Sequence, residues 1–322
     1  MTVKIVAEIS ANHGGSLSKA LDLIKMAASG GADYVKFQVF DPDKMATACC
    51  QAPKPWSGSL TQLYHRAVTP KKWVVSLFEY ARQLGITPFA SVFDFESLDF
   101  VASQKPSYIK IASLESTYWP LIKSASNTGI PLIISTGGMT AAELSDLDLN
   151  LLNGFIDVTF LACTASYPAH VSETKLGAIR QIKELTQRDV GLSDHTNSSV
   201  AAMLAVCCGA TMIEKHIALD DSSLDSDFSC IGLAAFSSFC ESVRSVDKML
   251  SNGIADQDQE LSRFKRAIYA IDDIQKGDLL TEGNMSILRG EGGGAHPRFW
   301  DILIHQRSTR AYTKSQGIAH DY

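Results

Sequence analysis

Short apolar segments alternate along the chain with longer segments in which apolar positions recur every three to four residues. The short segments are rich in β-branched residues, and several of the longer ones begin at Ser, Thr or Asp and end at Gly, as helices do. This alternation predicts repeated βα units with a parallel sheet. Eight strands are expected, at residues 3–10, 32–40, 86–93, 107–113, 131–137, 157–164, 189–195 and 211–219.

Two architectures accommodate these units: a closed (β/α)8 TIM barrel and a doubly wound open sheet. A dinucleotide-binding open sheet has Gly-x-Gly-x-x-Gly after its first strand, and AEISANHGGS does not match that motif. The (β/α)8 barrel is therefore favoured. Residues 41–68, after the second strand, are too many for an ordinary βα connection, so we expect them to form a lid or rim over the barrel mouth.

The pattern changes near residue 252, where the last helical segment of the repeated units ends. Residues 253–263 are polar and are interpreted as a linker. Residues 264–322 show short alternating segments separated by turn signals, which predict a small β-rich domain. We therefore expect a barrel domain over 1–252, a linker over 253–263, and a compact domain over 264–322. A domain of this size is marginally stable alone, so we expect it to pack against a partner surface.

The composition fits a folded globular protein and excludes several function classes. Of 322 residues, 45% are hydrophobic and 20% are charged, unlike the composition of disordered chains. The formal net charge of -6 lacks the basic excess that binders of nucleic acid or anionic membranes rely on. Neither partner is expected.

The cysteines and the N-terminal segment indicate the compartment. The seven cysteines include two adjacent pairs and no Cys-x-x-Cys spacing, so they predict neither a disulfide framework nor a zinc ribbon. The first residues lack the basic and apolar regions of a secretory signal, and no apolar run reaches the roughly 18–20 residues of a membrane span. A cytoplasmic location is predicted.

Polar side chains gather at the carboxyl ends of the predicted strands, where TIM barrels build their active sites. Burying so many ionisable groups is too costly to serve stability alone, so the pattern indicates a functional site. The residues concerned are Glu8, Asn12, His13, Lys36, Gln38, Thr87, Ser91, Lys110, Ser113, Glu115, Ser135, Thr136, Thr164, Tyr167, Ser193, His195, Glu214, Lys215 and His216.

His195 and His216 stand at the ends of neighbouring predicted strands. A single histidine at a strand end is more often a hydrogen-bonded core residue than a metal ligand. Neighbouring strands lie about 5 Å apart, however, so two imidazoles at their ends can reach one cation. With Glu8 and a later carboxylate nearby, the pair predicts a metal site.

Lys36 and Lys110 fit two kinds of chemistry. Lys110 could form a Schiff base, as in an aldolase, or both lysines could be cations that hold a phosphate group. The spacing of the two residues does not decide between these roles. The neighbouring Ser and Thr hydroxyls favour an anion site, because a phosphate accepts several hydrogen bonds at once.

Several motifs in chain order carry a family resemblance: AEISANHGGSLSKA, GADYVKFQ, YIKIASLES, PLIISTGGMT, CTASYP, VGLSDHT and GATMIEKHIALD. They resemble the sialic acid synthase family, whose members condense phosphoenolpyruvate with an N-acetylated hexose and release phosphate. The resemblance implies a (β/α)8 barrel followed by an antifreeze-like (SAF) domain, and KRAIYAIDDIQKGDLLTEGN is similar to the start of that domain.

Two segments, WSGSLTQLYHRAVTPKKWVVSLFEYARQLG and DSDFS, resemble pseudaminic acid synthases more than N-acetylneuraminate synthases. The acceptor implied by this resemblance is 2,4-diacetamido-2,4,6-trideoxy-altrose, which gives pseudaminic acid. The alternatives are an N-acetylneuraminate or legionaminic acid synthase that uses N-acetylmannosamine or its diacetamido analogue.

The resemblance also assigns roles to residues. His195 and His216 match ligands of a divalent cation, Mn²⁺ or Mg²⁺. Glu8, Glu115 and Asp225 match catalytic positions, and Glu8 and Asp225 would orient a metal-bound water. The implied substrate-binding residues are Lys36, Gln38, Thr87, Lys110, Ser113, Ser135, Tyr167, Ser193 and Arg289. Arg289 matches an arginine that reaches into the barrel of the other subunit, which implies a domain-swapped homodimer.

Three positions depart from the family pattern. Ala162 stands where the family usually has His, Ala165 replaces an Asn or Ser, and Gly290 replaces the Pro that follows the small-domain arginine. These departures predict a missing donor near the phosphate and a looser arginine loop. They motivate one non-enzyme alternative, a pseudoenzyme that binds a sugar phosphate, although the retained His195 and His216 argue against it.

Overall fold

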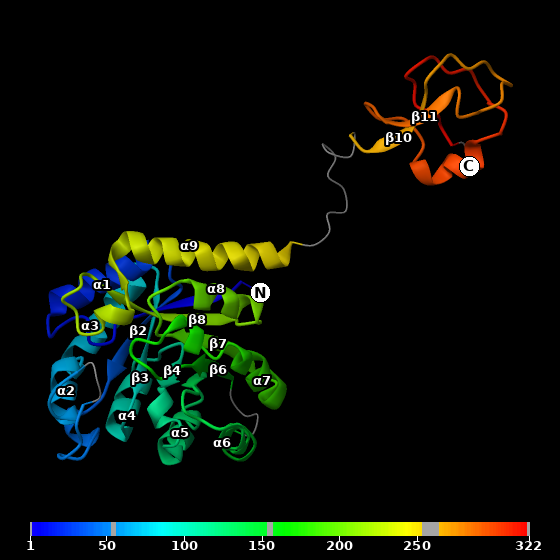
Figure 1. The fold of residues 1–322 in the computed structure, drawn as a ribbon. Helices are drawn as coiled ribbons and strands as arrows, with labels where there is room; N and C mark the ends of the chain where they lie inside the picture. The colour runs from blue at the N-terminus through cyan, green and yellow to red at the C-terminus, as the bar shows by residue number, and fades with distance from the viewer. Residues whose placement is uncertain (1, 53–55, 153–156, 253–263, 321–322) are drawn as a thin grey trace. The chain divides into compact units, whose positions relative to one another are not determined.

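Eight parallel strands close into a barrel in the computed structural model, which describes residues 2–52, 56–152, 157–252 and 264–320 (Figure 1). Each strand pairs with the next, and the last pairs with the first, so the open-sheet alternative is excluded. The strands are β1 (Lys4–Glu8), β2 (Tyr34–Val39), β3 (Thr87–Val92), β4 (Ile109–Ile111), β5 (Leu132–Ser135), β6 (Val158–Cys163), β7 (Asp189–Asp194) and β8 (Met212–Ala218). Every one lies within its predicted range, which confirms the (β/α)8 barrel.

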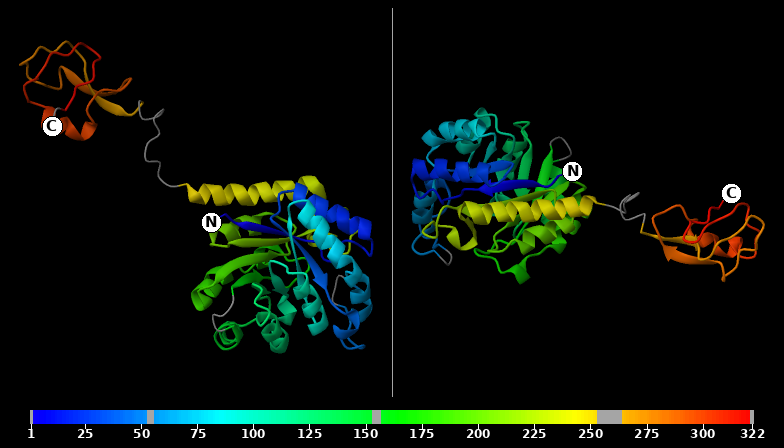
Figure 2. Two further views of the ribbon diagram at one scale, coloured as in Figure 1. Left: turned by 180° about the vertical axis from the view of Figure 1, so that it is seen from behind. Right: turned by 90° about the horizontal axis from the view of Figure 1, so that it is seen from above.

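Helices surround the strands, and the last of them, α9, lies along α8 and α1 (Figure 2). Their bounds are α1 (Leu17–Ser29), α3 (Lys71–Gln83), α4 (Phe95–Ser103), α5 (Trp119–Ser126), α6 (Ala141–Asp146), α7 (Gly177–Thr186), α8 (Val200–Cys207) and α9 (Gly232–Ser251). Short 3₁₀ turns occupy 113–115 (η2), 171–173 (η4) and 226–228 (η5), a π-helical segment (η3) follows α6 at 147–152, and β9 (Cys230–Ile231) pairs with the end of β8.

Strand alternation divides the interior into two layers. Along β8, Ile213 and Ile217 belong to the apolar core between the strands and the helices. Met212 faces inward and packs with Val6, Phe89, Ile133 and Leu161, which fill the amino-terminal end of the barrel. The inward positions further along β8, Glu214 and His216, are polar, because successive side chains in a strand point to opposite faces. The barrel is thus closed by apolar packing at one end and lined by polar groups at the other.

The segment 41–68 contains a short 3₁₀ turn, η1 (Pro42–Lys44), and the helix α2 (Leu60–Ala67). Ser59 and Gln62 form a reciprocal capping box that fixes the start of α2. The helix packs on Phe40, next to the barrel mouth, through Ala67 and Tyr64. Within the described residues, the predicted rim is confirmed.

The chain divides into two compact units, Met1–Ser251 and Asn252–Tyr322. The second unit contains an antiparallel pair, β10 (Arg266–Ala270) and β11 (Met285–Arg289), and two short turns of helix, η6 (Pro297–Phe299) and α11 (Trp300–Leu303). It has an apolar core of its own, built on Ile268, Ile274 and Ile318. The predicted linker, residues 253–263, lies outside the described residues. Across the described ranges, no helix has the length and apolar character needed to span a bilayer.

Candidate active site

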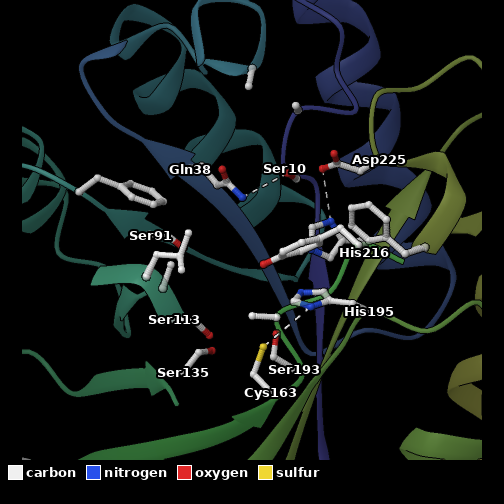
Figure 3. A pocket seen from close by; sticks show the side chains of 18 of the residues that line it. Ser10, Gln38, Ser91, Ser113, Ser135, Cys163, Ser193, His195, His216 and Asp225 are labelled. Atoms are coloured by element: carbon white, nitrogen blue, oxygen red, sulfur yellow. Dashed lines mark hydrogen bonds and ion pairs between the residues drawn. The ribbon is translucent and has the colours of Figure 1, made fainter. Parts of the chain in front are cut away.

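A cavity of about 620 Å³ opens at the carboxyl end of the barrel strands, and all eight strands or the loops after them contribute to its lining (Figure 3). Predicted site residues that line it are Lys36, Gln38, Lys110, Ser113, Glu115, Ser135, Tyr167, Ser193, His195, His216 and Asp225. Figure 3 shows Ser91, Ser113 and Ser135 to one side of the cavity and His195, His216 and Asp225 to the other. The structure therefore brings most of the predicted site together.

Thr87 is a correction to the predicted site. It is the first residue of β3, is exposed, and lines a small groove with Arg82 and Lys105 at the amino-terminal end of the barrel. Four residues of extended strand, about 13 Å, separate it from Ser91, which does line the cavity. The structure therefore contradicts the predicted place of Thr87 in the site, and Ser91 is the residue of this strand whose side chain lines the cavity.

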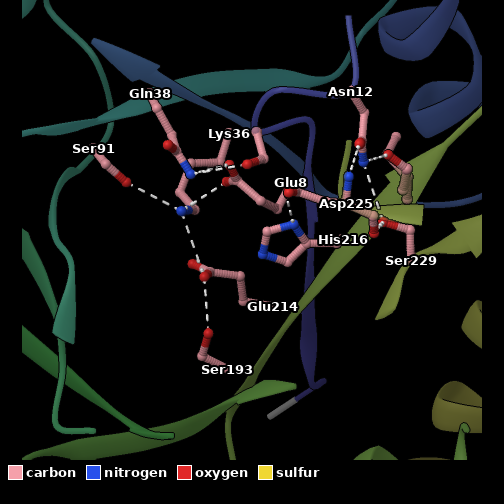
Figure 4. Close-up of polar contacts among 12 residues, drawn as sticks. Glu8, Asn12, Lys36, Gln38, Ser91, Ser193, Glu214, His216, Asp225 and Ser229 are labelled. Atoms are coloured by element: carbon pink, nitrogen blue, oxygen red, sulfur yellow. Dashed lines mark hydrogen bonds and ion pairs between the residues drawn. The ribbon is translucent and has the colours of Figure 1, made fainter. Parts of the chain in front are cut away.

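A buried ion network forms the floor of the cavity (Figure 4). Lys36 Nζ lies 2.7 Å from Glu8 Oε2 and 3.4 Å from Glu214 Oε1, and it donates to Ser91 Oγ at 3.1 Å. Ser193 Oγ donates to Glu214 Oε1 at 3.0 Å. Burial opposes the charge on Lys36, but Glu214 and Glu8 raise its pKa above the ordinary value. Lys36 is thus a fixed cation, compensated by two carboxylates.

Glu8 is the buried carboxylate of this network that does not reach the cavity. Its side chain is completely buried and is not part of the cavity lining. Besides the ion pair with Lys36, Glu8 Oε1 accepts a hydrogen bond from Gln38 Nε2 at 3.2 Å. Its contacts are those of a residue that positions Lys36 and Gln38.

Lys110 carries the second buried ammonium group of the floor. Its Nζ donates to Ser135 Oγ at 2.7 Å and to the Ile111 carbonyl oxygen at 2.9 Å. No described carboxylate lies within ion-pair distance of it. Burial lowers the pKa of Lys110 to about 8, with the charge of Lys36 adding to this effect and that of Glu214 opposing it. Lys110 thus has no paired carboxylate among the described residues. When protonated, it is available to pair with an anion bound in the cavity.

The loop after β5 approaches the same floor closely. Gly137 N donates to Ser113 Oγ at 3.1 Å. A Cβ atom on Gly137 would lie 2.7 Å from that oxygen, so a residue with a side chain would displace Ser113. Glycine at position 137 keeps a backbone N–H and a serine hydroxyl together beside Lys110, an arrangement suited to an anion.

His195 and His216 face one another across the opposite side of the cavity, with ring centroids 5.3 Å apart. His195 Nδ1 donates to the Thr164 carbonyl oxygen at 3.1 Å, which leaves the lone pair on Nε2. His216 Nδ1 lies 3.5 Å from Asp225 Oδ2 and forms no hydrogen bond to a described residue. Burial and the neighbouring His216 lower the pKa of His195 to about 3, so that ring is neutral at pH 7.

This pair fits a divalent cation. An imidazole whose Nδ1 atom faces an oxygen acceptor can present Nε2 as a metal ligand, the usual arrangement in metalloproteins. Burial would raise the pKa of Asp225, but contacts with His216 and Ser10 hold it below the ordinary value, so the carboxylate is charged. Among the described residues, no three His, Cys, Asp or Glu side chains are arranged so that together they could hold a metal ion. The site thus presents two imidazoles with a carboxylate beside them, and no complete set of protein ligands.

Asn12 connects the loop after β1 to the end of β8 and to the loop that follows it. Its Nδ2 donates to the Ile217 carbonyl oxygen at 2.8 Å and to Ser229 Oγ at 3.1 Å, and its Oδ1 accepts from Asp225 N at 2.9 Å (Figure 4). The side chain is 1% exposed. Asn12 therefore fixes the backbone that carries Asp225, a role that its position after the first strand did not reveal.

Glu115 and Tyr167 line the upper part of the cavity. Burial raises the pKa of Glu115 to about 7, against the opposing charge of Lys110, so both protonation states are present near neutral pH. A carboxyl group with such a pKa suits proton transfer. The centroid of the Tyr167 ring lies 4.4 Å from that of His195 and 5.3 Å from that of Phe228. This packing restricts the orientation of the His195 ring.

The three departures from the family pattern have different surroundings. Ala162 belongs to the core between the strands and the helices, so its side chain points away from the cavity and no donor is missing there. Ala165 lines the cavity. Gly290 follows β11 in the second unit, where a Cβ atom would lie 2.5 Å from Tyr269 Cζ, which explains glycine at this position. Arg289, just before it, is exposed on β11.

Comparison with known proteins places these observations in a family context. The profile of the NeuB family matches residues 23–255. Pseudaminic acid synthase of Campylobacter jejuni is 35% identical to this chain, with 96% of this chain and 93% of that protein covered. Pseudaminic acid synthase of Helicobacter pylori is 36% identical, with coverages of 99% and 97%. The crystal structure of N-acetylneuraminic acid synthetase from Leptospira borgpetersenii is similar at a TM-score of 0.74 and 27% identity, over 81% of this chain and 90% of that one.

Proposed function

The chain belongs to the NeuB family, and we propose that it condenses phosphoenolpyruvate with 2,4-diacetamido-2,4,6-trideoxy-altrose to form pseudaminic acid and inorganic phosphate. One structural observation carries the proposal: a single cavity holds two buried lysines among serine hydroxyls on its floor and two buried histidines beside a carboxylate. The first set suits the phosphate and carboxylate of phosphoenolpyruvate, and the second suits the oxygen atoms of a sugar aldehyde.

Phosphoenolpyruvate is proposed to bind on the floor of the cavity. Lys36 and Lys110 supply the positive charge, and the hydroxyls of Ser91, Ser113 and Ser135 donate hydrogen bonds. Ser193 and Gln38 complete the set, while Glu8 acts through Lys36 as a positioning residue in place of the water-orienting role predicted for it. In this position C3 of phosphoenolpyruvate faces the acceptor.

The reaction forms one carbon–carbon bond and, at C2, forms a carbon–oxygen bond to water and breaks the carbon–oxygen bond to phosphate. C3 of phosphoenolpyruvate attacks the aldehyde carbon, and the aldehyde oxygen takes up a proton, for which Glu115 is the proposed donor. Water adds to C2, Asp225 is the proposed acceptor of its proton, and the resulting tetrahedral centre expels phosphate. Both carboxyl groups line the cavity, as proton transfer to a bound substrate requires.

His195 and His216 are the proposed ligands of Mn²⁺ or Mg²⁺. When bound, the cation would supply Lewis acidity for the acceptor aldehyde. The residues that fit this role are the two imidazoles, through their Nε2 atoms, and Asp225 beside them. Tyr167 packs on His195 and would keep its ring in the orientation that ligation requires.

The second unit is proposed to be an antifreeze-like (SAF) domain that supplies Arg289 to the cavity of a partner subunit in a domain-swapped homodimer. Its own apolar core and the exposure of Arg289 support this assignment. We also propose that the protein acts in the cytoplasm. All seven cysteines are free thiols, the state that a reducing compartment maintains.

The pKa of Lys110 predicts a pH dependence. Only the protonated ammonium attracts phosphoenolpyruvate, so the affinity of the protein for this substrate should be constant below about pH 8 and fall up to tenfold per pH unit above it. Titration with phosphoenolpyruvate in the absence of acceptor, between pH 6.5 and 9.5, measures this effect separately from the proton transfer assigned to Glu115. In Lys110→Arg, whose guanidinium stays charged, the fall should move to higher pH. A profile that is unchanged in this variant would contradict the role of Lys110.

The function itself is tested by phosphate release from phosphoenolpyruvate with Mn²⁺ present. We expect release with the diacetamido-trideoxy-altrose acceptor, little with N-acetylmannosamine, and none after chelation of the metal. Release with N-acetylmannosamine alone would instead identify a neuraminate synthase. Activity that survives the chelator, with an adduct at Lys110 trapped by borohydride, would support the Schiff-base alternative. Binding of phosphoenolpyruvate without turnover of any acceptor would favour the pseudoenzyme.

A further inference from the structure

The floor of the cavity and part of its mouth differ chemically. The floor, on the barrel strands, carries the lysines and hydroxyls described above. Part of the mouth is made by described residues of the segment 41–68 and by residues just beyond the strand ends. We call this part the apolar wall, and it consists of Phe40, Met45, Tyr64, Ala67, Phe93 and Leu224.

The apolar wall is one packed cluster. Phe40 is 2% exposed, and its ring meets the rings of Tyr64 and Phe93 edge to face, with centroids 5.7 Å and 5.4 Å apart. Met45 and Leu224 pack against the same cluster and remain half-buried while lining the cavity. The wall therefore presents a contiguous apolar surface to whatever occupies the cavity.

Position in the cavity indicates which part of a substrate meets this wall. Lys36 and Lys110 lie within β2 and β4, whereas Met45, Tyr64 and Leu224 lie beyond the strand ends, towards the mouth. If phosphoenolpyruvate occupies the floor, the aldehyde carbon of the acceptor must point down towards it. The opposite end of the sugar, C5 and C6, then lies against the apolar wall.

The chemistry of the wall selects between substituents at that end of the sugar. In its side chains the hydroxyl of Tyr64 is the only oxygen or nitrogen. Away from the Tyr64 hydroxyl, a sugar hydroxyl pressed against the wall would lose its hydrogen bonds to water without replacement, whereas a methyl group would gain apolar contact. We propose that the apolar wall is the specificity element that selects acceptors with a C6 methyl group over acceptors with a C6 hydroxyl group. This inference rests on the proposed function.

The test compares two acceptors that differ at one atom: 2,4-diacetamido-2,4,6-trideoxy-altrose and its analogue that keeps the C6 hydroxyl. For the wild-type protein we expect kcat/KM to favour the deoxy sugar about 10- to 200-fold, the range by which apolar pockets discriminate small groups. In Met45→Gln and in Leu224→Asn, which place an amide on the wall, this ratio should fall about tenfold. The KM for phosphoenolpyruvate should stay the same.

Met139→Gln is the matched control. Met139 is half-buried as well, but it lines a separate small hollow near α6 and not the cavity. Its substitution should leave the ratio unchanged. Equal use of both sugars by the wild-type protein, or an unchanged ratio in both wall variants with normal binding of phosphoenolpyruvate, would overturn the inference while the synthase function stands. A wild-type protein that turns over neither sugar would overturn the proposed function itself.

Discussion

Replacing Lys36 with Met is expected to abolish phosphate release and to lower the free energy of unfolding by about 3–5 kcal/mol, the range found when one member of a buried ion pair is removed. Lys36 compensates Glu8 at 2.7 Å and Glu214 at 3.4 Å, and all three side chains are almost fully buried. Without the ammonium, two carboxylates are left unpaired in the barrel, and the proposed phosphate site loses its fixed cation. Urea unfolding and phosphate release measure the two losses separately.

Two further variants separate stability from activity. Lys36→Met combined with Glu8→Gln removes one of the unpaired charges, so it should recover part of the lost stability and none of the activity. Lys215→Met is the matched control, because Lys215 is an equally buried lysine paired with Asp194 at 3.0 Å, but it faces away from the cavity. It should be destabilised and still turn over when folded. Phosphate release by folded Lys36→Met would contradict the proposed role.

Replacing His216 or His195 with Ala is expected to lower the affinity for Mn²⁺ by more than about 100-fold, the upper range for loss of a residue that merely supports a metal ligand. Each substitution removes one of the two imidazoles that line the cavity and are the proposed ligands. Phosphate release at micromolar Mn²⁺ should fall with it. Calorimetric titration of the protein with Mn²⁺ measures the affinity directly, without reference to turnover.

His170→Ala is the control for this experiment, because His170 is an exposed histidine outside the cavity lining. It should bind Mn²⁺ like the wild-type protein. Circular dichroism checks that the two cavity variants are folded. Undiminished Mn²⁺ binding by both of them would show that the cation, if it is needed, is held elsewhere.

The fold was predictable from the sequence because each barrel strand is a short β-branched segment bounded by turn and cap residues. Polar groups at the carboxyl ends of those segments also predicted the cavity. Thr87 shows where this reasoning fails. Thr87 and Ser91 are four residues apart and share one face of β3, so alternation alone cannot separate a residue at the bottom of the barrel from one at its mouth.

Other parts of the site could be predicted from strand alternation. Glu214 is two residues before His216, so alternation places both on the inner face, while Lys215 between them faces outward. Applied to β6, the rule sets Ala162 on the face opposite to Cys163, which lines the cavity. The contacts of Asn12 were out of reach, because its partner Ile217 lies 205 residues away and only the folded barrel brings them together.

The barrel closes by pairing of its first strand, β1, with its last, β8, so closure must wait until nearly the whole barrel is synthesised. Besides the strand pairing and the Asn12 contacts, α9 secures the first strand, since Asp247 accepts a hydrogen bond from Val3 N at 3.0 Å and Arg244 pairs with Asp33. Ribosomes add about 5–20 residues per second, so β1 emerges roughly 10–40 s before its partner β8. We expect a nascent chain that stops before residue 212 to hold a sheet with two unpaired edges, the form most prone to aggregation, and to need shielding by chaperones until β8 is synthesised.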